Sequence, residues 1–137
     1  MEAYLIATAC TKFDKKPDQT FKDLTQEVYC DLLKSARVED GNMIGQAWFG
    51  NCGMGTFGQN NIRGQVCFTP LVQKKLFPER VGIINVEGGC ATGSMAFHGA
   101  WKDVIDQKKT VDKNTFVPEL RKQRNQARST FGGCAVL

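Results

Sequence analysis

Residues 81–101, VGIINVEGGCATGSMAFHGAW, contain a strand, a glycine-rich turn and the start of a helix in direct succession. Residues 81–86 are rich in β-branched side chains, which favour a strand. After Cys90, mainly apolar residues recur at helical spacing on one face, at Ser94, Phe97, Trp101, Val104 and Ile105. A strand that leads through a short turn into a helix is typical of a parallel sheet with helices packed on its faces.

Two earlier segments predict strands and one predicts a helix between them. Residues 3–10, AYLIATAC, form an apolar run suited to a buried strand, and residues 43–49, MIGQAWF, predict a second strand. Between them, Thr20 can cap a helix, and the Asp23 carboxylate suits its first turn. The apolar positions of this helix share one face: Phe21, Leu24, Val28 and Leu32. Gly41 is a plausible end.

A glycine-rich segment, Gly50 to Gly64, follows the second predicted strand. It indicates either a mobile surface loop or a place of close backbone approach that leads into a helix. Residues 61–77 are predicted to be helical in part, with Pro70 breaking or restarting the helix and Pro78 ending it.

The predicted order is therefore β-α-β-α-β-α, which places the chain in the α/β class with a mainly parallel sheet and flanking helices. At 137 residues and 15.2 kDa the chain has the size of one domain. Residues 1–105 carry the predicted elements. Residues 106–137 form a polar, basic C-terminal segment of different character, for which no confident fourth strand is predicted.

Charge is distributed unevenly along the chain. Residues 1–101 contain ten Lys or Arg and ten Asp or Glu, whereas residues 102–128 contain eight and four, which accounts for the whole net charge of +4. A neutral body argues against nucleic acid as the main partner. The sequence contains no apolar run long enough for a spanning helix and no secretory signal at its start. We therefore expect a cytoplasmic protein, with a peroxisome or a mitochondrion as the open alternative, for which the sequence shows no targeting signal.

The chain has six cysteines, at widely spaced positions: Cys10, Cys30, Cys52, Cys67, Cys90 and Cys134. No pair has C-x-x-C spacing and His98 is the only histidine, so a zinc site is not expected. Without an export signal, reduced thiols are the better interpretation. We expect no metal and no bound cofactor.

Cys90 is the candidate nucleophile. At the N-terminus of a helix, partial positive charge and unpaired N–H groups favour a thiolate and can stabilise an oxyanion on a bound acyl group. The small neighbours Gly88, Gly89, Ala91 and Gly93 would let a substrate approach the sulfur. Spacing alone leaves the alternative open that Cys90 is a structural cysteine packed beside a tight turn.

The segment Cys90-Ala91-Thr92-Gly93 resembles the acyl-enzyme motif of the thiolase family, which includes acetyl-CoA acetyltransferases and sterol-carrier-type thiolases. Upstream matches occur in the same order and extend the resemblance over about residues 3–105. They are Thr11-Lys12-Phe13, Asp23-Leu24 with Glu27, Gly50-Asn51 and Gly58-Gln59-Asn60.

The resemblance implies a thiolase-like βαβαβα half-domain and an acyltransferase that acts on acyl-CoA, by thiolysis or Claisen condensation, through an acyl group on Cys90. It also implies a homo-oligomer or a complementing thiolase half as partner. The family's G-H-P histidine, C-x-G cysteine and N-E-A-F-like segment are absent from these 137 residues, and Glu87 stands where many members have Asn. His98 lacks the G-H-P context and is predicted to be a helix-surface or core residue. We therefore expect an incomplete N-terminal portion that is inactive alone.

The last four residues, Cys134-Ala135-Val136-Leu137, match the C-a-a-X prenylation motif, and basic residues precede them. Cys134 is therefore a candidate prenylation site, and a membrane partner would be expected only if it is modified. The alternative function is a catalytically inactive thiolase-like module for binding or regulation, tethered through Cys134. The alternative interpretation is that the motif is incidental and that these residues form a partly disordered tail or a small terminal strand.

Overall fold

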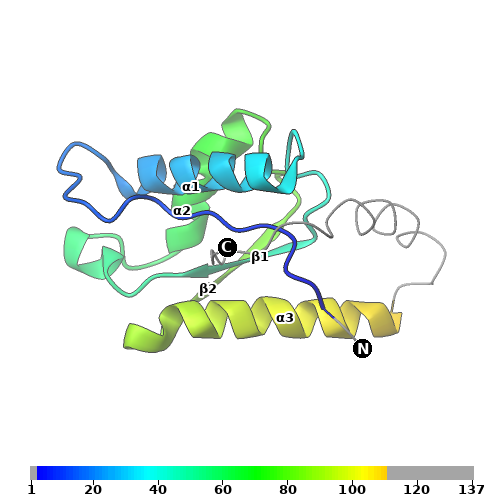
Figure 1. The fold of residues 1–137 in the computed structure, drawn as a ribbon. Coiled ribbons are helices and arrows are strands. Elements are labelled where there is room, and N and C mark those ends of the chain that lie inside the picture. The colour runs from blue at the N-terminus through cyan, green and yellow to red at the C-terminus, as the bar shows by residue number, and fades with distance from the viewer. Residues whose placement is uncertain (1–2, 111–137) are drawn as a thin grey trace.

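The computed structural model describes residues 3–110, with side chains as far as residue 106. Within residues 3–110, three helices and two strands make three layers, with α1 and α2 on one side of the sheet and α3 on the other (Figure 1). In chain order the elements are α1 Phe21–Ala36, β1 Gln46–Gly50, the 3₁₀ turn η1 Met54–Phe57, α2 Arg63–Gln73, β2 Gly82–Val86, the 3₁₀ turn η2 Gly89–Ala91 and α3 Thr92–Thr110. The predicted mixture of helices with a parallel sheet is confirmed.

The sheet of the described residues has two strands, β1 and β2, which pair in parallel with Gln46 opposite Gly82 and Gly50 opposite Val86. Both strands were predicted, with starts one to three residues earlier than observed. Side chains alternate between the two faces, as the pleat of a strand requires. Ala47 therefore points toward the α1 and α2 side, where it is buried, and Trp48 points toward α3.

The strand predicted at residues 3–10 is wrong for this structure. The segment has neither helical nor strand form, and in Figure 1 its blue trace crosses the view between α1 and α3. Tyr4, Leu5 and Ile6 remain about 60% exposed, at 62%, 60% and 61%. A run of consecutive apolar residues makes a buried strand only where packed layers cover both of its faces, and these three side chains lack that cover.

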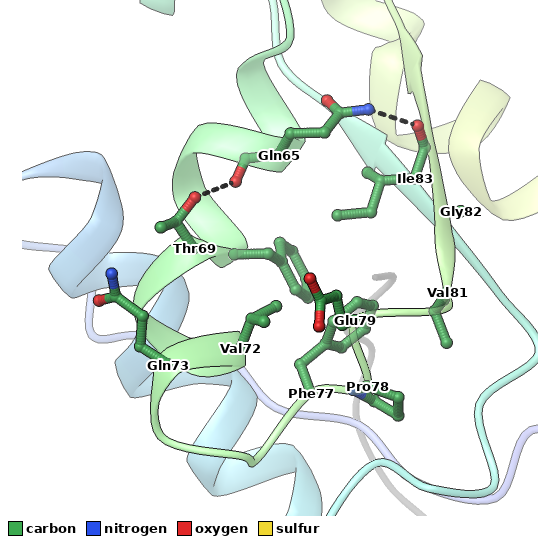
Figure 2. A pocket seen from close by; sticks show the side chains of 11 residues that line it. Gln65, Thr69, Val72, Gln73, Phe77, Pro78, Glu79, Val81, Gly82 and Ile83 are labelled. Carbon is green, nitrogen blue, oxygen red and sulfur yellow. Dashed lines mark hydrogen bonds between the residues drawn. The ribbon is translucent and has the colours of Figure 1, made fainter.

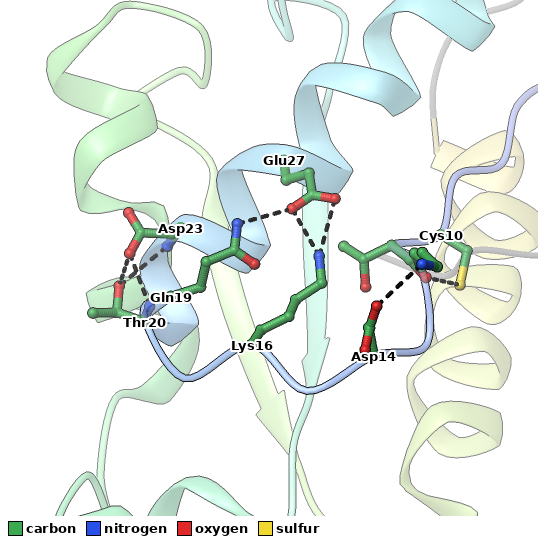
Figure 3. Close-up of polar contacts among 9 residues, drawn as sticks. Cys10, Asp14, Lys16, Gln19, Thr20, Asp23 and Glu27 are labelled. Carbon is green, nitrogen blue, oxygen red and sulfur yellow. Dashed lines mark hydrogen bonds and ion pairs between the residues drawn. The ribbon is translucent and has the colours of Figure 1, made fainter.

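Helix α1 begins as the sequence predicts. The Thr20 hydroxyl accepts a hydrogen bond from the Asp23 amide, and the Asp23 carboxylate accepts one from the Thr20 amide, which completes a capping box (Figure 3). The Thr20 hydroxyl also donates to Asp23 Oδ2 at 2.6 Å, and this bond, together with the one from the Thr20 amide, lowers the pKa of the Asp23 carboxyl. The helix ends at Ala36 rather than near Gly41, because Arg37 adopts a left-handed conformation and its amide closes the last turn.

The loop before α1 is tied to it by an ion pair. Lys16 Nζ lies 3.1 Å from Glu27 Oε2, and Gln19 donates to the same carboxylate oxygen (Figure 3). Such contacts order the loop although it has no regular secondary structure.

Pro70 does not break α2, contrary to the prediction. The helix runs continuously from Arg63 to Gln73. A proline forfeits one backbone hydrogen bond, but buried side chains on both sides of it, Phe68 and Leu71, hold the helix against the core. Tertiary packing outweighs the local cost.

The aromatic core lies on one face of the sheet, between the sheet and helices α1 and α2. Its centre is Phe68, whose ring meets those of Phe77, Tyr29 and Phe49 edge-on at centroid distances of 4.6, 5.8 and 6.3 Å. The buried members of this cluster are Tyr29, Leu33, Ala47, Met54, Cys67, Phe68, Leu71, Phe77 and Val81. The buried part of α1 is therefore Tyr29 and Leu33, whereas the predicted Leu24, Val28 and Leu32 are half-buried.

Helix α3 packs on the sheet through small side chains. Ala96 and Gly99 are buried, and a β-carbon on Gly99 would lie 2.5 Å from ring carbons of Trp48. The predicted helix is confirmed, but most of its predicted apolar face is turned to solvent, because Phe97, Trp101 and Val104 are 44–45% exposed. The helix also continues past residue 105, where the composition changes, to Thr110.

Candidate active site at the carboxyl end of the sheet

Cys90 lies in the η2 turn, between the end of β2 and the first residue of α3. This is the position that the sequence predicts. Gly50, the last residue of β1, allows α3 to begin close to the sheet, since a β-carbon there would lie 2.8 Å from Thr92 Cγ2. The turn that holds the cysteine is therefore fixed at the carboxyl end of both strands, where functional residues of parallel α/β sheets usually gather.

Thr92 closes this turn with its hydroxyl. Its Oγ1 accepts a hydrogen bond from the Gly88 amide at 2.9 Å and donates one to the Gly89 carbonyl at 2.8 Å. Gly89 has φ +54°, a left-handed conformation that suits glycine. Thr92 is buried and the Cys90 side chain is exposed. The turn is thus anchored from inside and presents its thiol to solvent.

Exposure alone does not single out Cys90. All five cysteines among residues 3–110 are free, and Cys10 and Cys52 are exposed as well. Cys30 is half-buried, and Cys67 is buried in the core, where burial raises the pKa of its thiol. Cys67 is therefore the structural, unreactive kind of cysteine.

The local backbone distinguishes Cys90 from Cys52, the exposed cysteine that follows β1. Both turns have occupied amides: Asn51 Oδ1 accepts from the amides of Gly53 and Met54 at 2.9 and 2.7 Å, and after Cys90 the Ala91 amide donates to the Gly88 carbonyl at 3.0 Å. The two turns differ in the helix that follows each. The turn after Cys52 leads only into the four-residue η1. Cys90 precedes the 19-residue α3, whose aligned peptide dipoles place partial positive charge at its first turn.

An arginine that we did not single out from the sequence lies beside this turn. Arg63, the first residue of α2, donates from Nη1 to the Asn51 carbonyl at 2.5 Å and from Nη2 to Glu87 Oε2 at 2.6 Å. It thereby joins the segment after β1 to the segment after β2. A signal for it exists in the sequence: Arg63 is the only charged residue between Asp40 and Lys74, and Glu87 is the only one between Arg80 and Lys102.

His98 lies on the exposed surface of α3 and stacks on Trp101, with ring centroids 5.5 Å apart. The prediction of a helix-surface histidine is confirmed. Within residues 3–106, no cluster of three or more His, Cys, Asp or Glu side chains could hold a metal ion.

Two open grooves lie near the sheet, and neither is lined by Cys90. The first, about 340 Å³, lies between α2 and β2, with Phe77 and Val81 at its apolar wall (Figure 2). The second, about 370 Å³, runs along α3 and is lined by Trp48, Val86, Met95, His98, Gly99, Lys102, Asp103 and Asp106. Its Met95 side chain also lies against Gly88, so this groove reaches the turn that holds Cys90.

Cys134 and the basic segment from residue 111 lie outside the described residues, so the structure bears on neither. None of the helices within residues 3–110 is long and apolar enough to cross a membrane. A scan against protein-family models finds no match to the sequence. A search of the curated proteins likewise finds no match.

Proposed function

We propose that this chain is the N-terminal portion of a thiolase-type acyltransferase that acts on acyl-CoA, with Cys90 as the residue that takes the acyl group. The observation that carries the proposal is the position of Cys90, exposed in a threonine-anchored turn directly before a 19-residue helix and directly after a parallel strand. The ordered sequence resemblance over about residues 3–105 supports the same reaction.

The reaction begins when the Cys90 thiolate attacks the thioester carbonyl of acyl-CoA. A C–S bond forms to Cys90, and the carbonyl electrons move to oxygen, where backbone N–H groups at the start of α3 can stabilise the oxyanion. When the carbonyl re-forms, the bond to CoA sulfur breaks, and CoA leaves as a thiolate that takes up a proton. The acyl group then remains on Cys90 as a new thioester.

The later steps need groups beyond Cys90. Claisen condensation and thiolysis both include proton transfers, and a side chain that catalyses such a transfer typically raises the rate roughly 10²–10⁴-fold. The family's histidine and second cysteine are not among these 137 residues. The isolated chain is therefore proposed to accept one acyl group without turning over.

Incubation of the full chain with acetyl-CoA, followed by intact mass measurement, tests the proposal. We expect one acetyl group, released by hydroxylamine as a thioester would be, and no acetoacetyl-CoA in the mixture. Cys90→Ala should abolish the adduct, and Cys52→Ala, which removes the other exposed thiol at this end of the sheet, should retain it. An adduct that survives Cys90→Ala, or steady formation of acetoacetyl-CoA, would contradict the proposed role. Absence of any adduct would favour the alternative of an inactive binding module.

A further inference from the structure

We infer that Arg63 is a positioning residue for Cys90, acting through Glu87 to hold the turn at the start of α3 in one place. The inference extends the proposed function, because it concerns what supports the same thiol. It rests on three observations. The guanidinium of Arg63 donates to two different loops, the residue before Arg63 has a strained backbone, and the first turn of α2 packs closely on β2.

The guanidinium of Arg63 connects two loops that are far apart in sequence. One contact goes to the backbone of Asn51, one residue after β1, and the other to the carboxylate of Glu87, three residues before Cys90. The Arg63 side chain is only 13% exposed, whereas that of Glu87 is 51% exposed. A planar guanidinium can donate to both acceptors at once, which a lysine ammonium on its flexible chain does less well.

The residue before Arg63 has a strained backbone. Ile62 has φ +45° and ψ +37°, and a β-branched side chain rarely adopts this left-handed conformation. The side chain of Ile62 is 61% exposed, so burial of that side chain does not explain the conformation. Strain of this kind persists where surrounding contacts demand it, and here the contacts begin at the next residue, Arg63.

The first turn of α2 is also pressed onto β2, which leaves Arg63 little freedom. A β-carbon on Gly64 would lie 2.6 Å from Ile83 Cγ2, and the Gly64 amide donates to Asn85 Oδ1 at 2.6 Å. Asn85 in turn donates to Gln65 Oε1 at 2.7 Å. The backbone that carries Arg63 is therefore fixed to β2, the strand that leads to Cys90. The ion pair with Glu87 adds a side-chain contact to the loop between β2 and Cys90.

The structure offers a matched control in Arg80. Its guanidinium also makes two hydrogen bonds, both to one segment of the backbone, because it donates to the carbonyls of Asn42 and Ile44 at 2.6 and 3.3 Å. This segment lies before β1, at the opposite end of the sheet from Cys90. If Arg63 contributed only to overall stability, the variants at the two positions would respond alike.

The test compares alkylation of each cysteine by iodoacetamide in the full chain, mapped by mass spectrometry, for Arg63→Gln, Glu87→Gln, the double variant and Arg80→Gln. Arg63→Gln should lower the rate at Cys90 by about tenfold relative to Cys10, an exposed cysteine outside both loops that Arg63 joins, because Cys90 would move away from the partial positive charge at the first turn of α3. Glu87→Gln should have a smaller effect because its amide oxygen still accepts a hydrogen bond. The double variant should be no slower than Arg63→Gln, and Arg80→Gln should leave the ratio unchanged.

Hydrogen exchange of the amides of residues 87–91 is the second measurement. Arg63→Gln should speed this exchange, and Arg80→Gln should not. The inference would be overturned if Arg63→Gln and Arg80→Gln responded equally in either measurement. It would also be overturned if Arg63→Gln, in folded protein, changed neither the relative labelling rate of Cys90 nor the amide exchange of residues 87–91. A wild-type Cys90 that labels no faster than Cys30 would count against the proposed function instead, and loop exchange would still decide the role of Arg63.

Discussion

The two faces of the sheet are built in different ways. The face covered by α1 and α2 buries large aromatic side chains, with Phe68 at the centre of a cluster of rings. On the face covered by α3, Ala96 and Gly99 make the close contact, and Trp48 Nε1 donates to Asp103. The large apolar side chains Phe97, Trp101 and Val104 of α3 are 44–45% exposed. Most of the apolar burial therefore lies on the face covered by α1 and α2. On the other face, the helix that follows the Cys90 turn contacts the sheet mainly through small residues.

The largest difference between the faces should appear when one phenylalanine is truncated on each. Phe68→Ala leaves a cavity among rings and should lower the free energy of unfolding by about 4 kcal/mol. Phe97→Ala removes a side chain that is 45% exposed and should change it by less than about 0.5 kcal/mol. Urea denaturation of both variants measures the contrast, and similar losses would show that the α3 face is as well buried as the other.

The second prediction concerns the stability of the aromatic face at alkaline pH, which depends on the buried Tyr29. Burial, with smaller effects of the charges of Asp40 and Cys30, raises the pKa of Tyr29 to about 12 from an ordinary value of 10. The unfolded chain therefore loses this proton first, so the contribution of Tyr29 to stability is complete below pH 10 and falls between pH 10 and 12, by about 2 kcal/mol.

Stability measured against pH in the wild type and in Tyr29→Phe isolates this effect. Tyr29→Phe should reduce the alkaline slope, at a cost of about 1 kcal/mol at neutral pH for the hydrogen bond to the Leu76 carbonyl. An unchanged slope in Tyr29→Phe would mean that the core on this face is open to water.

The third difference tests the closeness of the α3 contact. Gly99→Ala adds a methyl group against Trp48, whose indole Nε1 is held by Asp103 at 2.6 Å and cannot easily move. We expect a net loss of about 1 kcal/mol, because overpacking exceeds the gain in helix propensity. Gly93→Ala, on the same helix with open space around it, should instead gain about 0.5 kcal/mol. Thermal unfolding of the two variants checks the sign of each change.

A change in stability as small as that of Phe97→Ala is expected at Trp101, which is 44% exposed on α3. Trp101→Gln should alter the free energy of unfolding by less than about 0.5 kcal/mol but reduce self-association, because exposed apolar surface favours contact between copies. Sedimentation velocity at several concentrations measures the association. Unchanged association would remove this helix from the predicted oligomer contact.

The local elements of the fold could be predicted because their causes act within a few residues. Thr20 and Asp23 cap α1 by contacts across three positions, and the two β-rich runs become β1 and β2. The turn around Cys90 belongs to the same class, since a strand, two glycines and a helix follow one another without a break. The reactivity proposed for Cys90 stays a prediction, although its position is confirmed.

The packing of the elements against one another depends on contacts between segments that are distant in sequence, which local sequence rules do not anticipate. Periodicity locates an apolar stripe on a helix but does not say which side meets the sheet, and in α3 the closest approach is made where Gly99 leaves room for Trp48. An apolar run such as residues 3–10 becomes a strand only if neighbours cover it. Arg63 and Glu87 stand alone in long uncharged stretches, but only the seating of α2 beside β2 brings them to 2.6 Å. Opposite charges become partners when the chain has folded, because their attraction depends on distance in space and not on separation along the sequence.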